Sequence, residues 1–118
     1  MCRAGASWAQ SDLLSNNPKL RIKVYAVWFD VLASDARDQW DPSIFSDPRV
    51  TQFWDGGRRT GDWFASKVTG QRAFAWDAYF LYGPASRWVT IPTELLASGS
   101  PVIAGTREIT RSLHLKQR

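Results

Sequence analysis

The sequence is poor in the residues that build metal centres and redox sites. Its 118 residues include one cysteine, Cys2, and one histidine, His114. A single cysteine excludes an internal disulfide, a cysteine-based zinc site and a CxxC redox pair. A lone histidine argues against a histidine metal site or a catalytic triad, and we interpret His114 as a surface residue near the end of the last helix. The sequence therefore predicts neither a metal nor another cofactor.

Long apolar segments are also missing. No stretch approaches the roughly 18 apolar residues of a membrane span, and the first residues lack the apolar run of a signal peptide. Because cysteine is so scarce, a reducing compartment fits best, and we expect a soluble cytoplasmic protein without membrane contact. The length and the 44% hydrophobic content are typical of one globular domain. We expect an N-terminal arm or short helix over residues 1–19 and a single globular domain over residues 20–118.

The charge of the chain is positive but dispersed. Eleven arginines and four lysines oppose nine aspartates and two glutamates, which gives a net charge of +4 and a pI near 9.6. This balance permits binding to polyanions, yet the scattering of the cations makes nucleic acid a less favoured partner. The densest basic cluster lies near the C-terminus, where we interpret it as cations at the negative end of a helix dipole: Arg107, Arg111, His114, Lys116 and Arg118.

Three segments carry strand patterns. Residues 20–31 alternate at first and then become apolar on both faces, which is typical of a strand that is covered on both sides. Residues 73–82 are rich in aromatic side chains, and residues 87–91 follow after the turn at 83–86. We therefore predict a β-hairpin from the second and third strands, followed by a loop over residues 95–100.

Helices are predicted from capping residues and apolar spacing. Asp47-Pro48 has the N-cap and first residue of a helix, in which Val50, Phe53 and Trp54 give an apolar stripe. Gly56-Gly57 would end this helix. The remaining helices are predicted over residues 34–40, 60–68 and 105–115, and a short first helix is considered around residues 7–14.

The order of these elements predicts a small α/β or α+β domain. It would contain a mixed sheet, a C-terminal β-hairpin and a closing helix, with the helices packed on the sheet. The order resembles the thioredoxin-like fold through residues 24–29, the hairpin 74–91 and the helix from residue 105. The resemblance implies a fold without its redox activity. Residues 29–35 read Phe-Asp-Val-Leu-Ala-Ser-Asp where that family has CxxC, and Gln71-Arg72-Ala73 stands where it has a cis-proline. A ferredoxin-like sandwich or another α+β fold fits the same order.

Tryptophan and aspartate stand next to each other at four places, in Trp40-Asp41, Trp54-Asp55, Asp62-Trp63 and Trp76-Asp77. We interpret most of these tryptophans as core residues and most of the aspartates as helix caps. Asp77 differs because it falls inside a predicted apolar strand. A carboxylate in that place needs solvent, a cavity or an arginine, since an unpaired buried charge is costly.

A second polar group follows the first predicted strand. In open α/β sheets ligands bind at the carboxyl ends of the strands, and this segment carries Asp30, Asp35, Arg37 and Asp38. Combined with the strand that contains Asp77, it predicts a ligand-binding site without assigned catalytic residues or metal ligands. Its predicted members are Trp28, Asp30, Asp35, Arg37, Trp76, Asp77 and Tyr79.

These features favour a non-catalytic binding or protein-interaction module. An aromatic pocket would take a small organic ligand or a protein partner, and aromatic residues at the surface would favour a homodimer. One alternative is a small enzyme in which Asp30, Asp35 or Asp77 serves as the acid or base. The other is nucleic-acid binding through arginines and exposed tryptophans. The residues by themselves leave all three hypotheses open.

Overall fold

The computed structural model describes residues 3–29, 42–70, 75 and 77–115. The chain divides into two units: unit 1 contains Met1–Gly5 and Trp76–Arg118, and unit 2 contains Ala6–Ala75. The chain contains both helices and strands, so the fold class is mixed α/β, as expected. No helix in the described ranges has the length and apolar character needed to cross a membrane.

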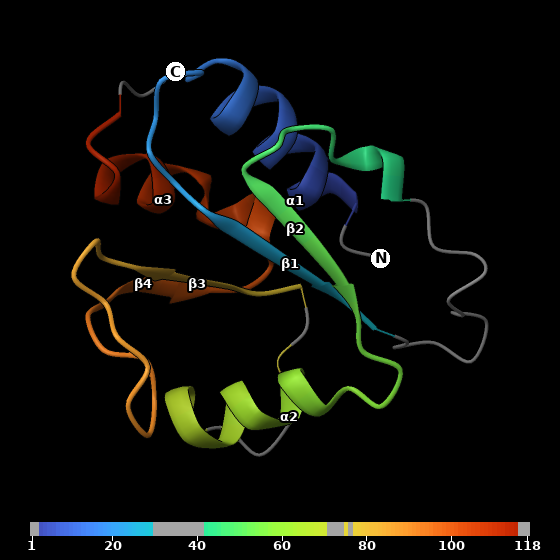
Figure 1. Ribbon diagram of the computed structural model, residues 1–118, viewed down its shortest axis with the longest axis vertical. Helices are drawn as coiled ribbons and strands as arrows, with labels where there is room; N and C mark the ends of the chain where they lie inside the picture. Colours follow the sequence, from blue (N-terminus) through green and yellow to red (C-terminus); the bar gives the residue numbers. More distant parts are fainter. Residues whose placement is uncertain (1–2, 30–41, 71–74, 76, 116–118) are drawn as a thin grey trace. The chain divides into compact units, whose positions relative to one another are not determined.

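Unit 2 contains a pair of parallel strands, β1 (Val24–Trp28) and β2 (Val50–Trp54), which lie side by side in Figure 1. Val24 is opposite Val50, and Trp28 is opposite Trp54. β1 confirms the centre of the strand predicted over residues 20–31. Because side chains alternate along a strand, the odd-numbered positions of both strands share one face and the even-numbered positions share the other.

β2 replaces the helix predicted after Asp47-Pro48, and that prediction is wrong. Val50, Thr51, Phe53 and Trp54 are β-branched or aromatic residues, which favour strands once a partner strand is present. The Asp47 carboxylate accepts hydrogen bonds from the main-chain and side-chain nitrogens of Arg49 instead of capping a helix. Pairing with β1 thus overrides a local helix signal.

Helical segments complete unit 2. Helix α1 (Arg3–Trp8), whose first residues up to Gly5 belong to unit 1, continues into the π-helical segment η1 (Ala9–Ser15), whose Leu13 and Leu14 are buried. This stretch contains the short first helix considered around residues 7–14. Helix α2 (Arg59–Phe64) continues into η4 (Ala65–Thr69) and ends at Gly70, which has a φ of 69°. The helix predicted over residues 60–68 is therefore confirmed, whereas the helix predicted over residues 34–40 lies outside the described residues.

Unit 1 contains an antiparallel pair, β3 (Tyr79–Tyr82) and β4 (Leu95–Gly99), as Figure 1 shows. A C-terminal hairpin was expected, but its second strand is β4 and not residues 87–91. The predicted loop over residues 95–100 is correspondingly wrong. Residues 87–91 instead belong to a segment that folds back on itself, with a β-bridge between Trp88 and Pro92. β3 therefore pairs with β4 and not with this segment.

The last residues of the strand predicted over residues 73–82 form β3, whereas residues 73, 74 and 76 lie outside the described residues. Asp77 has a φ of 45°, a left-handed conformation that interrupts extended backbone, so β3 starts at Tyr79. The closing helix is confirmed as α3 (Thr106–Ser112), which follows a 3-10 turn, η5 (Val102–Gly105). Ala97 of β4 and Ile109 of α3 are the buried apolar residues of unit 1.

Candidate functional site

Two residues of the predicted site, Asp77 and Tyr79, lie in unit 1 and have local partners. The Asp77 carboxylate accepts a hydrogen bond of 3.2 Å from the main-chain nitrogen of Val102 at the start of η5. The Tyr79 ring lies against Gly99 and Gly105, and a Cβ atom added at Gly105 would overlap the ring. Asp77, in the bend before β3, and Tyr79, in β3, therefore both contact the segment that leads into α3.

The hydroxyl of Tyr79 faces a carboxylate of α3. Burial raises the pKa of Tyr79, and the hydrogen bond and charge of Glu108 raise it further. A phenol with a raised pKa keeps its proton near neutral pH and is a poor base. We therefore assign Tyr79 a packing role in unit 1.

Trp28, the predicted site residue of β1, is half-buried. Its indole nitrogen donates a hydrogen bond of 3.0 Å to Oε1 of Gln52, and Gln52 in turn donates through Nε2 to the main-chain oxygen of Pro42. This chain of bonds satisfies the indole N–H and joins β1, β2 and the 3-10 turn η3 (Pro42–Ile44). The other predicted site residues lie outside the described residues: Asp30, Asp35, Arg37 and Trp76.

Two aspartates of unit 2 have structural roles. The carboxylate of Asp55 accepts hydrogen bonds from the main-chain nitrogens of Thr60 and Gly57, at 2.6 and 3.4 Å, and so caps α2. Burial raises the pKa of Asp55, but these main-chain bonds outweigh it and the pKa falls below its usual value. Asp55 therefore fits the interpretation that most of the aspartates beside tryptophans have structural roles.

Arg49 and Asp47 form the densest polar network in the described part of unit 2. The guanidinium group bonds both oxygens of Asp47, at 2.7 and 2.9 Å. It also donates to three main-chain oxygens, those of Leu14, Asn17 and Leu20, at 2.7 to 3.0 Å. The hydrogen bonds from Arg49 lower the pKa of Asp47 from 3.8 to about 2. All of these partners belong to the protein itself, so we assign the network a structural role and not a ligand-binding role.

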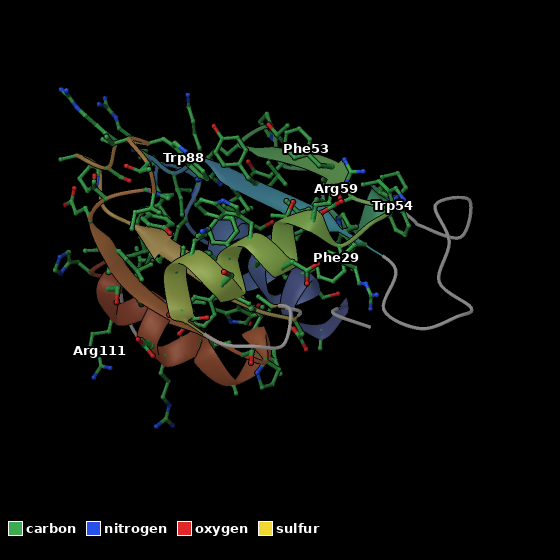
Figure 2. All side chains as sticks on the ribbon, turned by 90° about the horizontal axis from the view of Figure 1, so that it is seen from below. Phe29, Phe53, Trp54, Arg59, Trp88 and Arg111 are labelled. Atoms are coloured by element: carbon green, nitrogen blue, oxygen red, sulfur yellow. The ribbon has the colours of Figure 1, made fainter. Side chains whose placement is uncertain are left out.

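One exposed apolar surface lies in unit 1, on the loop between β3 and β4. We call residues 87–93 the Trp88 loop; Figure 2 labels Trp88 on it. Trp88 is 62% exposed and Val89 is 75% exposed, and Ile91 is also exposed. Short hydrogen bonds close the loop at Thr93, whose nitrogen donates to the oxygen of Arg87 at 2.9 Å and whose Oγ1 accepts from the nitrogen of Arg87 at 2.9 Å. The loop thus holds apolar side chains outward on a fixed main chain.

A second exposed surface lies in unit 2, on the odd-numbered face of β1 and β2. Tyr25 is 64% exposed and Phe53 is 48% exposed, and Figure 2 labels Phe53 on β2. Their ring centroids are 6.5 Å apart, with an angle of 28° between the ring planes. The two rings form a stacked pair at the surface of the sheet.

In the ranges that the structure describes, no group of three or more histidine, cysteine, aspartate or glutamate residues could hold a metal ion. No family model, no curated protein and no solved structure matches this chain. The resemblance to the thioredoxin-like fold therefore stays a prediction.

Sequence reasoning missed both surfaces. The Trp88 loop carries a readable signal, because three apolar residues, Trp88, Val89 and Ile91, stand between a Gly-Pro turn and Pro92. We interpreted that signal as a paired strand. The stacked pair had no such signal, since it joins a strand to a segment that was predicted to be a helix.

Proposed function

We propose that this protein is a non-catalytic protein-interaction module that self-associates through the Trp88 loop. The observation that carries the proposal is the outward position of Trp88 and Val89 on a loop fixed by its own hydrogen bonds. Large apolar side chains at a surface are costly to hydrate, and a contiguous apolar patch is typical of an interaction site. Trp is also among the residues that contribute most to binding energy in interfaces.

The rigidity of the loop supports binding. Besides the two bonds between Arg87 and Thr93, the hydroxyl of Ser86 donates to the oxygen of Thr93 at 2.6 Å, and the nitrogen of Gly83 donates to the oxygen of Glu94 at 2.9 Å. A loop that is already ordered loses little conformational entropy when it binds. The apolar side chains are thus presented at little additional entropic cost.

A second copy of the chain is a suitable partner for chemical reasons. A two-fold interface uses the same patch on both copies, so the patch must hold both a protruding group and an apolar surface to receive it. Trp88 and Val89 supply the protruding group. Leu95 and Leu96 of β4, which are 41% and 46% exposed, supply an apolar surface in the same unit.

The alternative hypotheses have less support. Trp28 and Tyr79 are engaged in contacts inside their own units, which reduces the aromatic groups available to line a pocket for a small organic ligand. The Asp77 carboxylate accepts a hydrogen bond from the main-chain nitrogen of Val102. This contact does not favour a role for Asp77 as acid or base. An enzyme based on Asp30 or Asp35 stays a prediction.

Sedimentation equilibrium over a range of protein concentrations tests the proposal. We expect a reversible dimer, and we expect Trp88→Ala to raise its dissociation constant by about 30-fold or more, since hot-spot residues contribute about 2 kcal/mol or more. Thr90→Ala is the matched control, because Thr90 is an exposed polar residue of the same loop. A strict monomer at the highest concentration attainable would refute self-association, and an equal effect of the two variants would refute the role of the loop.

A further inference from the structure

The odd-numbered face of the β1–β2 pair is a continuous exposed surface. Exposure alternates along the chain from Leu20 to Ala26, with Arg21, Lys23 and Tyr25 exposed and the residues between them half-buried. Tyr25 lies in β1, and Arg21 and Lys23 immediately precede that strand. We assign the three residues to one face because their exposure alternates with the period of two that is typical of extended segments. We call it the Tyr25 face.

β2 contributes the other part of the Tyr25 face. Thr51 is opposite Tyr25, and Phe53 is opposite Val27. Thr51 and Phe53 are exposed, whereas Val50, Gln52 and Trp54 are half-buried. Strands in parallel sheets are usually covered on both faces, so an exposed aromatic pair on such a sheet favours a surface that binds a partner.

The positive charge of the Tyr25 face indicates an anionic partner. Its members are Arg21, Lys23, Tyr25, Val27, Thr51 and Phe53, which include two cations and no acidic residue. Neither Arg21 nor Lys23 forms an ion pair with another described residue. The only ion pair found among the described residues joins Arg49 to Asp47, so the two cations of the face are available to an anionic ligand.

We infer that the Tyr25 face binds single-stranded nucleic acid, with bases stacked on Tyr25 and Phe53 and phosphates paired with Arg21 and Lys23. Proteins that bind single strands without sequence preference combine aromatic platforms with cations that follow the backbone. Both components lie on this face. The proposal concerns a surface in unit 2 and does not depend on self-association through the Trp88 loop.

The geometry favours a single strand over a duplex. Tyr25 is 64% exposed and Phe53 is 48% exposed, so each ring offers a surface on which an unpaired base can stack. In a duplex the faces of the bases are covered by their neighbours, so the exposed rings would have nothing to stack on.

Fluorescence anisotropy with a labelled oligothymidylate of about 12 nucleotides, within the ~4–16-nucleotide sites of such proteins, tests this inference. We expect binding at low salt that is weaker for a duplex of the same length. Tyr25→Ala should weaken binding by about 5-fold or more, and so should Phe53→Ala, because each would remove the stacking of one base. Tyr25→Phe, which keeps the ring, should retain the affinity of the wild type.

The cations are tested with charge-matched variants. The double variant Arg21→Gln, Lys23→Gln should reduce the slope of log affinity against log salt by about 1.4, or about 0.7 for each phosphate contact that is lost. Lys67→Gln is the control, because Lys67 is an exposed cation on η4. Trp88→Ala should leave the affinity unchanged, which separates this inference from the proposed function.

Three outcomes would overturn the inference. The first is that the full chain does not bind the oligonucleotide at low salt. The second is that binding is as tight to duplex as to single strand, or survives Tyr25→Ala and Phe53→Ala unchanged, since the contact would then be electrostatic only. The third is that Lys67→Gln reduces the salt slope as much, for each charge removed, as the double variant of Arg21 and Lys23 does. Circular dichroism spectra that match the wild type confirm that each variant is folded.

Discussion

The two exposed surfaces place aromatic side chains in solvent by different means. In unit 1, Trp88 stands on a loop whose closing bonds join residues close together in the chain, such as Arg87 and Thr93. In unit 2, Tyr25 and Phe53 meet across parallel strands that are distant in the chain. The first surface follows from local structure, whereas the second exists only when β1 and β2 are paired.

The chemistry of the two surfaces also differs. The loop of unit 1 is bounded by one cation, Arg87, and one anion, Glu94, so its charge is balanced and its apolar residues set its partner. The Tyr25 face has cations but no anion. Exposed aromatic residues therefore carry little functional meaning by themselves, because the neighbouring charges decide whether a protein or a polyanion is the better partner.

The largest expected effect concerns the hydrogen-bond network of Arg49 in unit 2. Arg49→Ala removes the hydrogen bonds to the oxygens of Leu14, Asn17 and Leu20 and leaves Asp47 without its cation. We expect the free energy of unfolding to fall by about 2–3 kcal/mol, because hydrogen bonds to charged groups are among the stronger ones and the carbonyls lose their partner. Urea denaturation measures this loss.

The Arg49→Ala variant should also affect the two units to different extents. Amide hydrogen exchange should accelerate more in β2 than in β3, because the network of Arg49 lies in unit 2. Equal acceleration in both strands would mean that the chain unfolds as one cooperative unit. Arg59→Ala is the control, since Arg59 is exposed, and surface substitutions usually change stability by less than about 0.5 kcal/mol.

An intermediate effect is expected at two glycines, one in each unit. A Cβ atom at Gly61 would lie 2.6 Å from the main-chain oxygen of Ala75, whereas one at Gly105 would overlap the side chain of Tyr79. Gly61→Ala should lower the free energy of unfolding by about 1–3 kcal/mol, and Gly105→Ala by less if the Tyr79 ring can shift. Thermal denaturation of both variants measures the difference. A larger loss for Gly105→Ala would show that the Tyr79 ring is held as firmly as main chain.

The smallest expected effect is a dependence on pH in unit 2. Because the pKa of Asp47 is about 2 in the folded protein and 3.8 is its ordinary value, the pair with Arg49 stabilises the fold above pH 3.8. This stabilisation is lost as the pH falls from 3.8 towards 2. The difference in denaturation midpoint between the wild type and Asp47→Asn should shrink over this range. Asp12→Asn, at an exposed carboxylate, is the charge control, and a difference that stays constant with pH would contradict the prediction.

Local signals predicted several elements correctly. The helices predicted over residues 60–68 and 105–115 correspond to α2 with η4 and to α3. The capping role of Asp55 also follows from local preference. These features depend on main-chain geometry over a few residues, which the identity of those residues largely determines.

The errors occurred where a distant partner decided the structure. Asp47 and Pro48 favour a helix start, but β1 lies beside the following residues and β2 forms. Residues 87–91 have the composition of a strand, yet β3 pairs with β4. The ligand site that was predicted from Trp28, Asp77 and Tyr79 stays a prediction, and the structure gives each of these residues a contact within its own unit.

The residues alone indicate the mixed α/β class, the helices predicted over residues 60–68 and 105–115, and the excess of positive charge. Which strands pair is a property of the folded chain, and so are the stacking of Tyr25 on Phe53 and the closed loop that carries Trp88. A helix forms through hydrogen bonds within one segment, whereas a pair of strands needs hydrogen bonds between segments far apart in the chain.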